Sequence, residues 1–248
     1  TLNFKNLSGA KLDLVIRAYN DGIAFKYIFP ENDKNLYTVI KELSGFNLPE
    51  KGQAWIQPYD IATAYAPAYE RNYEEEMPIG TAAPSKEGWG FPALFETEKH
   101  WVLLTEANLK DNFYGSHLNP KTAGGLYTIT PPNEEEAFGY GDSKARSTLP
   151  WEMPWRVIII GDEVGDIVES NLVSHVSDAS VIADPSWILP GRASWGWWSG
   201  YLDKSNDTPE KLKRFIDFAQ IMGWEYSMVD AGWDNREGLD IKELAVLK

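Results

Sequence analysis

The residues best suited to chemistry lie near the end of the chain, where tryptophan and acidic side chains follow two short apolar segments. Trp197 and Trp198 follow the first segment, and the second leads into Asp230, Trp233 and Asp234. Carboxylates accept hydrogen bonds from hydroxyl groups, and indole rings can stack on the C–H faces of a sugar. We therefore treat Trp198, Asp230 and Trp233 as candidate substrate-binding residues, although these tryptophans could equally belong to a core.

The same segment raises the question of a catalytic pair of carboxylates. Enzymes that hydrolyse glycosides use two such groups, and the distance between them sets the stereochemical course. Asp230 and Asp234 are four residues apart, but nothing in the sequence fixes their geometry. We therefore assign no catalytic residue within this chain.

Glu106 is a further candidate, because it directly follows the apolar run Trp101–Thr105. An acid in that place is either a solvated strand end or a ligand held by a rigid sheet edge, and the sequence alone favours the solvated end. The chain has no Cys and three His, without the spacing of a transition-metal site. Any bound metal would therefore be a hard cation held by oxygen atoms, such as Ca²⁺.

Charge and hydropathy exclude two classes of partner. The 248 residues include 23 Lys and Arg against 37 Asp and Glu, for a net charge of −14, and such a surface repels nucleic acid. The longest apolar run, Val157–Ile160, is far too short to span a bilayer. The acidic runs Glu74–Glu76 and Glu134–Glu136 are most simply solvated loops, with a cation site as the alternative.

The elements that would hold these residues are strands over the first 160 residues. Leu12, Leu14 and Ile16 alternate on one face, Asn20–Gly22 forms a turn, and a return strand ends at Pro30. Further short strands are predicted over 37–43, 54–57, 93–96, 101–105, 125–130 and 156–160. Short strands with frequent Pro and Gly indicate a large antiparallel β-sandwich.

The pattern changes after residue 163. A short helix is predicted within Val164–Val176, with Ile167, Leu172 and Val176 as its buried side, and 184–191 looks like a linker. A strand over 192–198, a helix from about 209 that ends at Gly223, and a strand over 224–230 form a βαβ unit. We expect domains at 1–185 and 186–248, the second being the start of an incomplete (β/α)₈ barrel.

Several runs in this order resemble glycoside hydrolase family 97. They are Asp21–Phe29, Phe91–Thr97, Trp101–Ala107, Gly165–Val173 and Trp187–Trp198. The resemblance implies an N-terminal β-super-sandwich followed by the start of a catalytic barrel. It also implies an exo-acting α-glucosidase or α-galactosidase that hydrolyses terminal α-linked sugars of oligosaccharides, with calcium in the active site.

By the same resemblance, Glu106 is the calcium ligand that the sandwich contributes, which reverses the expectation from the sequence alone. The catalytic carboxylates are expected beyond Lys248, on the missing part of the barrel, so the chain by itself is expected to be inactive. Family members are exported, which implies a periplasmic or secreted protein. The alternative is a non-catalytic carbohydrate-binding sandwich, which the aromatic residues Tyr59, Tyr65, Tyr69 and Tyr73 would serve.

Overall fold

The computed structural model describes residues 1–63, 71–137, 141–197 and 209–230. The chain divides into two compact units, residues 1–179 and 180–248. Within the described residues, no helix has both the length and the apolar character that crossing a membrane requires.

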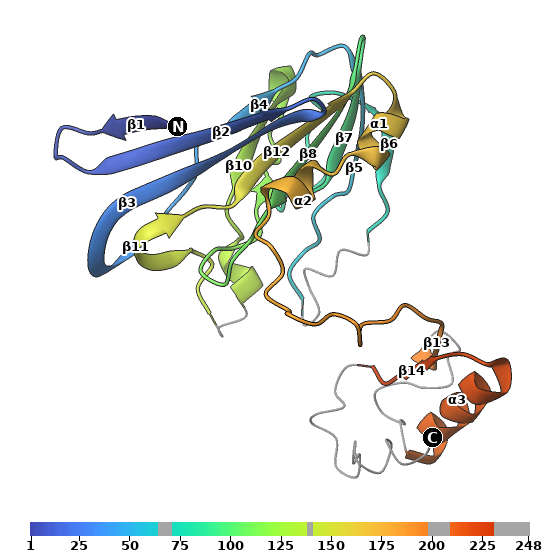
Figure 1. Ribbon diagram of the computed structural model, residues 1–248. Coiled ribbons are helices and arrows are strands. Elements are labelled where there is room, and N and C mark those ends of the chain that lie inside the picture. Colours follow the sequence, from blue (N-terminus) through green and yellow to red (C-terminus); the bar gives the residue numbers. More distant parts are fainter. Residues whose placement is uncertain (64–70, 138–140, 198–208, 231–248) are drawn as a thin grey trace. The chain divides into compact units, whose positions relative to one another are not determined.

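The first unit is built on a large antiparallel sheet, with its first strands in blue in Figure 1. Among the described residues, the order of strands across the sheet is β1 (Leu2–Lys5), β2 (Lys11–Tyr19), β3 (Gly22–Thr38), β12 (Trp155–Gly161), β8 (Trp101–Ala107), β7 (Ala93–Thr97), β5 (Gly52–Ile56) and β6 (Glu74–Pro78), and β11 (Arg146–Glu152) also pairs with β3. A smaller antiparallel sheet contains β4 (Gly45–Asn47), β10 (Leu126–Thr130) and β9 (His117–Leu118).

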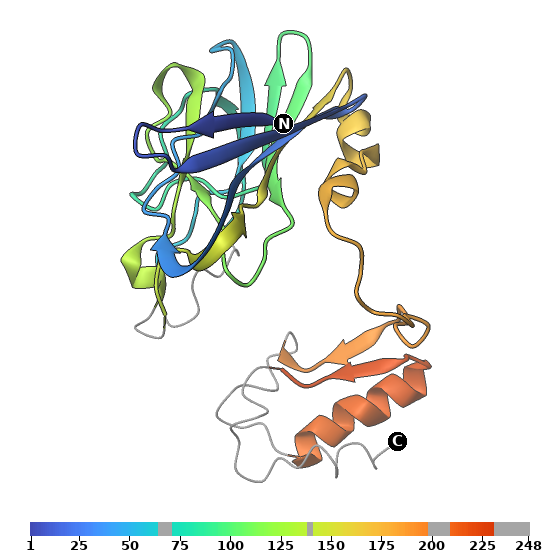
Figure 2. The same ribbon diagram turned by 60° about the vertical axis from the view of Figure 1, so that its left-hand side comes forward.

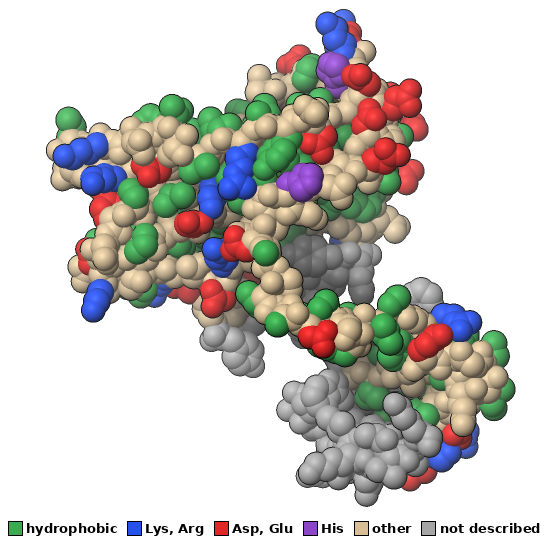
Figure 3. Space-filling model, in the orientation of Figure 1, with side chains coloured by type: hydrophobic (Ala, Val, Ile, Leu, Met, Phe, Trp, Pro, Cys, Tyr) green, Lys and Arg blue, Asp and Glu red, His purple; other side chains and the backbone are tan. Residues whose placement is uncertain are grey.

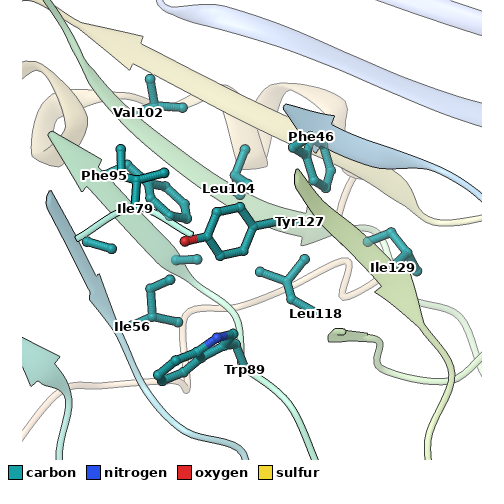
Figure 4. Packing of buried hydrophobic residues seen from close by; sticks show 12 residues of the cluster. Phe46, Ile56, Ile79, Trp89, Phe95, Val102, Leu104, Leu118, Tyr127 and Ile129 are labelled. Atoms are coloured by element: carbon teal, nitrogen blue, oxygen red, sulfur yellow. The ribbon is translucent and has the colours of Figure 1, made fainter. Parts of the chain in front are cut away.

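The main core lies between these two sheets (Figure 4). Tyr127 of β10 lies at its centre beside Leu104, and its ring meets Phe95 edge-on at 4.8 Å between centroids. The Tyr127 hydroxyl accepts a hydrogen bond from the amide of Gly80 at 3.0 Å, so the one polar atom of this ring is satisfied. Side chains from both sheets share this core, which confirms the mainly antiparallel β-sandwich.

Two short helices pack on the sheet rather than the single predicted one. They are α1 (Val164–Glu169) and α2 (Leu172–Val176). Leu172 and Val176 are buried against β12, and Ile167 packs beside them, so the predicted buried side is confirmed. Acidic side chains gather around α1, in agreement with the net negative charge (Figure 3).

Two expected strand ends are wrong. Pro30 does not end its strand, because β3 continues to Thr38. The register against β11 is irregular between the pairs Phe29–Trp151 and Asp33–Leu149, so Pro30 lies in a bulge, where its missing N–H costs no ladder hydrogen bond. The predicted strand over 37–43 is also wrong, since the chain leaves the sheet after Thr38.

The acidic run Glu74–Glu76 was expected as a loop, but it belongs to β6, an edge strand of the large sheet. The side chains of all three residues are exposed. Charged side chains on an edge strand oppose pairing with another chain, which accounts for an acidic run in this place.

The second unit contains β13 (Ala193–Trp195), α3 (Pro209–Met222) and β14 (Tyr226–Met228). The two strands are parallel, and α3 lies against them, as Figure 2 shows. Gly223 ends the helix at φ 65°, as expected of a C′ glycine. Parallel strands joined by a helix confirm the βαβ unit, whereas a (β/α)₈ barrel remains a prediction, because open sheets contain the same unit.

Candidate functional site: a buried carboxylate cluster and a strand-end pair

Glu106 occupies a rigid position in the interior of the sandwich. It lies on β8 directly opposite Arg156 of β12 in the antiparallel register. Directly opposite residues point to the same face of a sheet, so the two side chains meet without any loop to position them. Only 9% of the Glu106 side chain is exposed, so Glu106 is not the solvated strand end that the sequence alone favours.

Arg156 binds two carboxylates at once. Its Nη1 donates to Glu106 Oε2, while Nε and Nη2 donate to the two oxygens of Glu42 at 3.1 and 2.6 Å. The other oxygen of Glu106 accepts the amide N–H of Ser116 at 3.0 Å. The guanidinium is 1% exposed, so this cluster of Glu42, Arg156 and Glu106 is a buried ion triad with one negative charge in excess.

Burial and ion pairing act in opposite directions on the charged groups of the triad. Burial raises the pKa of Glu106, and the charge of Arg156 and the amide of Ser116 oppose that rise without cancelling it. Burial acts to lower the pKa of Arg156, but hydrogen bonds and charges of Glu42 and Glu106 outweigh it, so the pKa is raised. Burial and the charge of Glu42 raise the pKa of Tyr114 to about 12, so its hydroxyl stays protonated.

The segment 112–116, which follows β8, contains buried polar atoms without hydrogen-bond partners among the described residues. Asn112 Oδ1, Tyr114 Oη and Ser116 Oγ are buried and have no hydrogen-bond partner in the described part of the chain. Buried polar atoms without partners are costly unless water or a ligand satisfies them. The segment 112–116, which contacts Glu106 through Ser116, therefore has three polar atoms that can still form hydrogen bonds.

Calcium requires six to eight oxygen ligands, so the donor set of this site can be compared with that need. The described residues contain no group of three or more acidic or His side chains that could hold a metal ion. Glu106 nevertheless suits a hard cation, because the triad has an uncompensated negative charge and the carboxylate is held rigidly. Among the described residues, Glu106 is thus a single carboxylate with the charge that a hard cation needs, not part of a complete site.

The strand ends of the second unit bring together Asp230 and a tryptophan that the sequence did not single out. Trp195, the last residue of β13, donates its indole N–H to Asp230 Oδ2 at 2.8 Å. The carboxyl ends of parallel strands meet at one edge, so this pair follows from the topology. Trp198 and Trp233, the other candidate substrate-binding residues, lie outside the described residues, as does Asp234.

A second buried polar cluster corrects the expectation for the acidic run 134–136. Glu136 is not solvated, since its Oε2 lies 3.1 Å from Nε2 of His117, a residue with no exposed surface. Nδ1 of His117 donates to the Glu87 carbonyl at 2.8 Å, and the ring of Tyr59 stacks on the imidazole. Tyr59 is therefore a core residue, Tyr73 is exposed, and Tyr65 and Tyr69 fall outside the described ranges.

Comparison with known proteins gives a consistent result. Residues 1–179 match the family model described as Glycosyl-hydrolase 97 N-terminal. The chain is 32% identical over 233 residues to a "probable retaining alpha-galactosidase" of Streptomyces bingchenggensis, which covers 93% of this chain and 33% of that protein. It is 27% identical to a retaining alpha-galactosidase of Bacteroides thetaiotaomicron, over 94% of this chain and 38% of that protein.

Solved structures share the fold. A beta-arabinopyranosidase crystal structure superposes with a TM-score of 0.83 at 30% identity, over 99% of this chain and 39% of that one. A variant of a glycoside hydrolase family 97 enzyme from Pseudoalteromonas sp. strain K8 gives a TM-score of 0.76 at 21% identity, with the same coverage of each chain. The chain thus spans little more than a third of the length of the proteins it matches.

Proposed function

Because this chain belongs to glycoside hydrolase family 97, whose N-terminal domain it carries over residues 1–179, we propose that it is the N-terminal part of a retaining, exo-acting α-galactosidase. The observation that supports this most directly is the similarity to two retaining alpha-galactosidases over more than nine-tenths of the chain. Hydrolysis itself would require catalytic carboxylates from outside these 248 residues.

The substrate class follows from the chemistry that the relatives share. A β-L-arabinopyranoside has the ring stereochemistry of an α-D-galactopyranoside without the hydroxymethyl group at C5. A pocket for one sugar therefore differs from a pocket for the other mainly in the space around that position. We propose α-galactosides as the preferred substrates, β-L-arabinopyranosides as the first alternative and α-glucosides as the second.

Two groups of residues in this chain would serve such an enzyme. Asp230, held by Trp195, would accept hydrogen bonds from sugar hydroxyls, with Trp198 and Trp233 providing aromatic faces. Glu106 would donate one oxygen ligand to a calcium ion, and Arg156 would fix the orientation of that carboxylate. A bound calcium ion would supply electrostatic stabilisation of charge and orient the sugar hydroxyls. Export to the periplasm or the medium is part of the same proposal.

The test is hydrolysis by the longer protein that contains this chain. Assays with the p-nitrophenyl derivatives of α-D-galactose, β-L-arabinopyranose and α-D-glucose should show turnover, fastest for the galactoside. Proton NMR of the galactoside reaction should show that galactose is first released as the α-anomer, as expected for retention. No turnover of any of the three substrates would remove the proposal.

The calcium ligand is tested with a matched pair of variants in that protein. Chelation should reduce activity, and added Ca²⁺ should restore it. Glu106→Gln should weaken Ca²⁺ binding by about ten-fold or more in calorimetric titration, because a charged ligand is replaced by a neutral one. Glu98→Gln, at a side chain that is 65% exposed, should leave Ca²⁺ binding unchanged. Equal Ca²⁺ affinity in both variants would exclude Glu106 as a ligand.

A further inference from the structure

An open groove lies on the sandwich unit, between the strands β1, β2, β3 and β11. Its volume is about 850 Å³, within the range of small-molecule sites. The wall residues come from the turn between β1 and β2, from the outer half of β3 and from β11. None of them belongs to the buried triad or to the strand-end pair.

Aromatic rings dominate the apolar part of this groove. Phe4 of β1 and Tyr37 of β3 are 52% and 41% exposed, so both rings present apolar surface to solvent. Trp151 of β11 is almost fully buried, and its ring lies 6.3 Å from that of Phe29. Two exposed rings over a buried aromatic base provide flat apolar surfaces at a concave site.

The polar groups of the groove are fixed in position. The Tyr37 hydroxyl donates to Asp33 Oδ2 at 2.6 Å, which locks both side chains, and Asp33 Oδ1 accepts the Asn35 amide at 2.8 Å. Glu31 accepts the backbone amide of Lys11. Each carboxylate oxygen has a second lone pair, so these groups can still accept hydrogen bonds from a ligand.

Two observations restrict what would bind. Trp151 lines the groove, and its indole N–H is buried and has no partner in the described part of the chain. The groove also contains two lysines, Lys5 and Lys11, against two acids, Glu31 and Asp33. Balanced charges favour a neutral ligand, whereas a purely apolar segment would leave the remaining lone pairs of the two carboxylates unused and take them out of water.

We propose that this groove binds a neutral oligosaccharide. Pyranose rings would stack on Tyr37 and Phe4, and their hydroxyl groups would hydrogen-bond to Asp33, Glu31 and the indole N–H of Trp151. A sugar combines apolar C–H faces with hydroxyls that both donate and accept, which matches the groove in shape, polarity and charge. The proposal goes beyond the proposed function, because it requires binding without hydrolysis and uses the sandwich unit.

The experiment is calorimetric titration of the 248-residue chain with maltoheptaose, stachyose and a galactosylated mannopentaose, and with an oligogalacturonate as the anionic comparison. We expect at least one neutral probe to bind and the anionic probe not to bind. Tyr37→Ala and Phe4→Ala should each weaken binding by about five-fold, as expected for the loss of one stacked ring. Trp151→Phe, which retains a ring but removes the N–H, should weaken it by a smaller factor.

Leu36→Ala is the matched control, because Leu36 is 64% exposed beside Tyr37 on the same strand but does not line the groove. Circular dichroism of each variant establishes that it is folded. The proposal is overturned if no neutral probe binds, or if Tyr37→Ala and Phe4→Ala bind as tightly as Leu36→Ala. It is also overturned if binding is lost in the longer protein, since the groove would then be an internal interface. Failure of this test leaves the hydrolysis assay unaffected.

Discussion

At Arg156, a single guanidinium pairs with two buried carboxylates inside the sandwich and leaves one negative charge in excess. The Arg156→Met variant should be less stable than the parent chain by about 3–5 kcal/mol, because Glu42 and Glu106 would remain buried without a counter-charge. The free energy of unfolding from urea titrations measures the loss.

Arg146→Met provides the comparison for that variant. Arg146 pairs with Asp142 at 2.5 Å, but its side chain is 51% exposed. Exposed ion pairs contribute at most about 1 kcal/mol, so the loss should be small. Similar losses in the two variants would show that the buried triad contributes no more than a surface pair.

Glu136 should make stability dependent on pH in the acidic range. Burial acts to raise the pKa of Glu136, but hydrogen bonds from His117 and the Asn133 amide outweigh it, so the pKa in the folded state lies below the ordinary value. A lowered carboxyl pKa contributes stability above the unfolded-state pKa of about 4.3, and that stability is lost as the pH falls through the folded-state pKa.

Unfolding of the Glu136→Gln variant from pH 7 to pH 3 tests this expectation. Glu136→Gln should be less stable than the parent at pH 7, and the difference should shrink below about pH 4. Glu134→Gln, at a neighbouring side chain that is 86% exposed, should follow the parent throughout. A difference between Glu136→Gln and the parent that stays constant with pH would contradict the linkage.

Most side-chain contacts of the candidate site could not be predicted from the sequence. Glu106 was identifiable as an acid after an apolar strand, but its partner Arg156 is 50 residues away and Glu42 is 114 residues from Arg156. Such contacts depend on the strand order, in which β12 inserts between β3 and β8. Asp230 was singled out because it follows an apolar strand, whereas its hydrogen bond to Trp195 depends on the parallel register.

At the scale of elements, alternating apolar residues and turn residues correctly predicted the hairpin, in which neighbouring strands along the chain pair with each other. The hairpin over β2 and β3 pairs Ile16 with Phe25 and Ala18 with Ile23, around the predicted turn. The same local rules failed at Pro30, because a bulge against β11 tolerates proline, and β11 comes more than 100 residues later. Local patterns thus predicted β2, β3, β5, β7, β8, β10 and β12 but missed β1, β4, β6, β9 and β11. Distant partners decided where the strands end.

Gly22, at the start of β3, has no room for a side chain. Its φ is 154°, and a Cβ atom there would lie 2.1 Å from the carbonyl oxygen of Ile158 on β12. Gly22→Ala must therefore push apart two paired strands, and we expect a loss of about 2 kcal/mol or more in the free energy of unfolding.

Gly165→Ala is the control for that substitution. Gly165 lies within α1, needs no positive φ, and has no described atom within 4 Å of the place that a Cβ atom would take. Alanine favours a helix over glycine by up to about 1 kcal/mol, so Gly165→Ala should be neutral or stabilising. A Gly22→Ala variant as stable as the parent would show that β3 and β12 can separate at little cost.

For the molecule as a whole, the exposed segment 178–193, which spans the boundary along the chain and the start of the second unit, determines how the chain should respond to proteases. Every described residue from 178 to 193 is exposed, and Trp187, at 71%, is the most exposed aromatic side chain in the described ranges. Proteases cleave exposed backbone outside secondary structure first. Chymotrypsin should therefore cut after Trp187 early, before it cuts at the described strands.

That cut should leave a folded sandwich, because the apolar contacts of the first unit lie within residues 1–179. Mass spectrometry of a short digestion should show a product ending at Trp187, with the β-type circular dichroism of the parent. Trp187→Ser should abolish this product and leave slower cuts unchanged. Cleavage within β3, β8 or β12 before the segment would mean that the sandwich opens more readily than its buried core implies, and the first unit would then depend on the second for its stability.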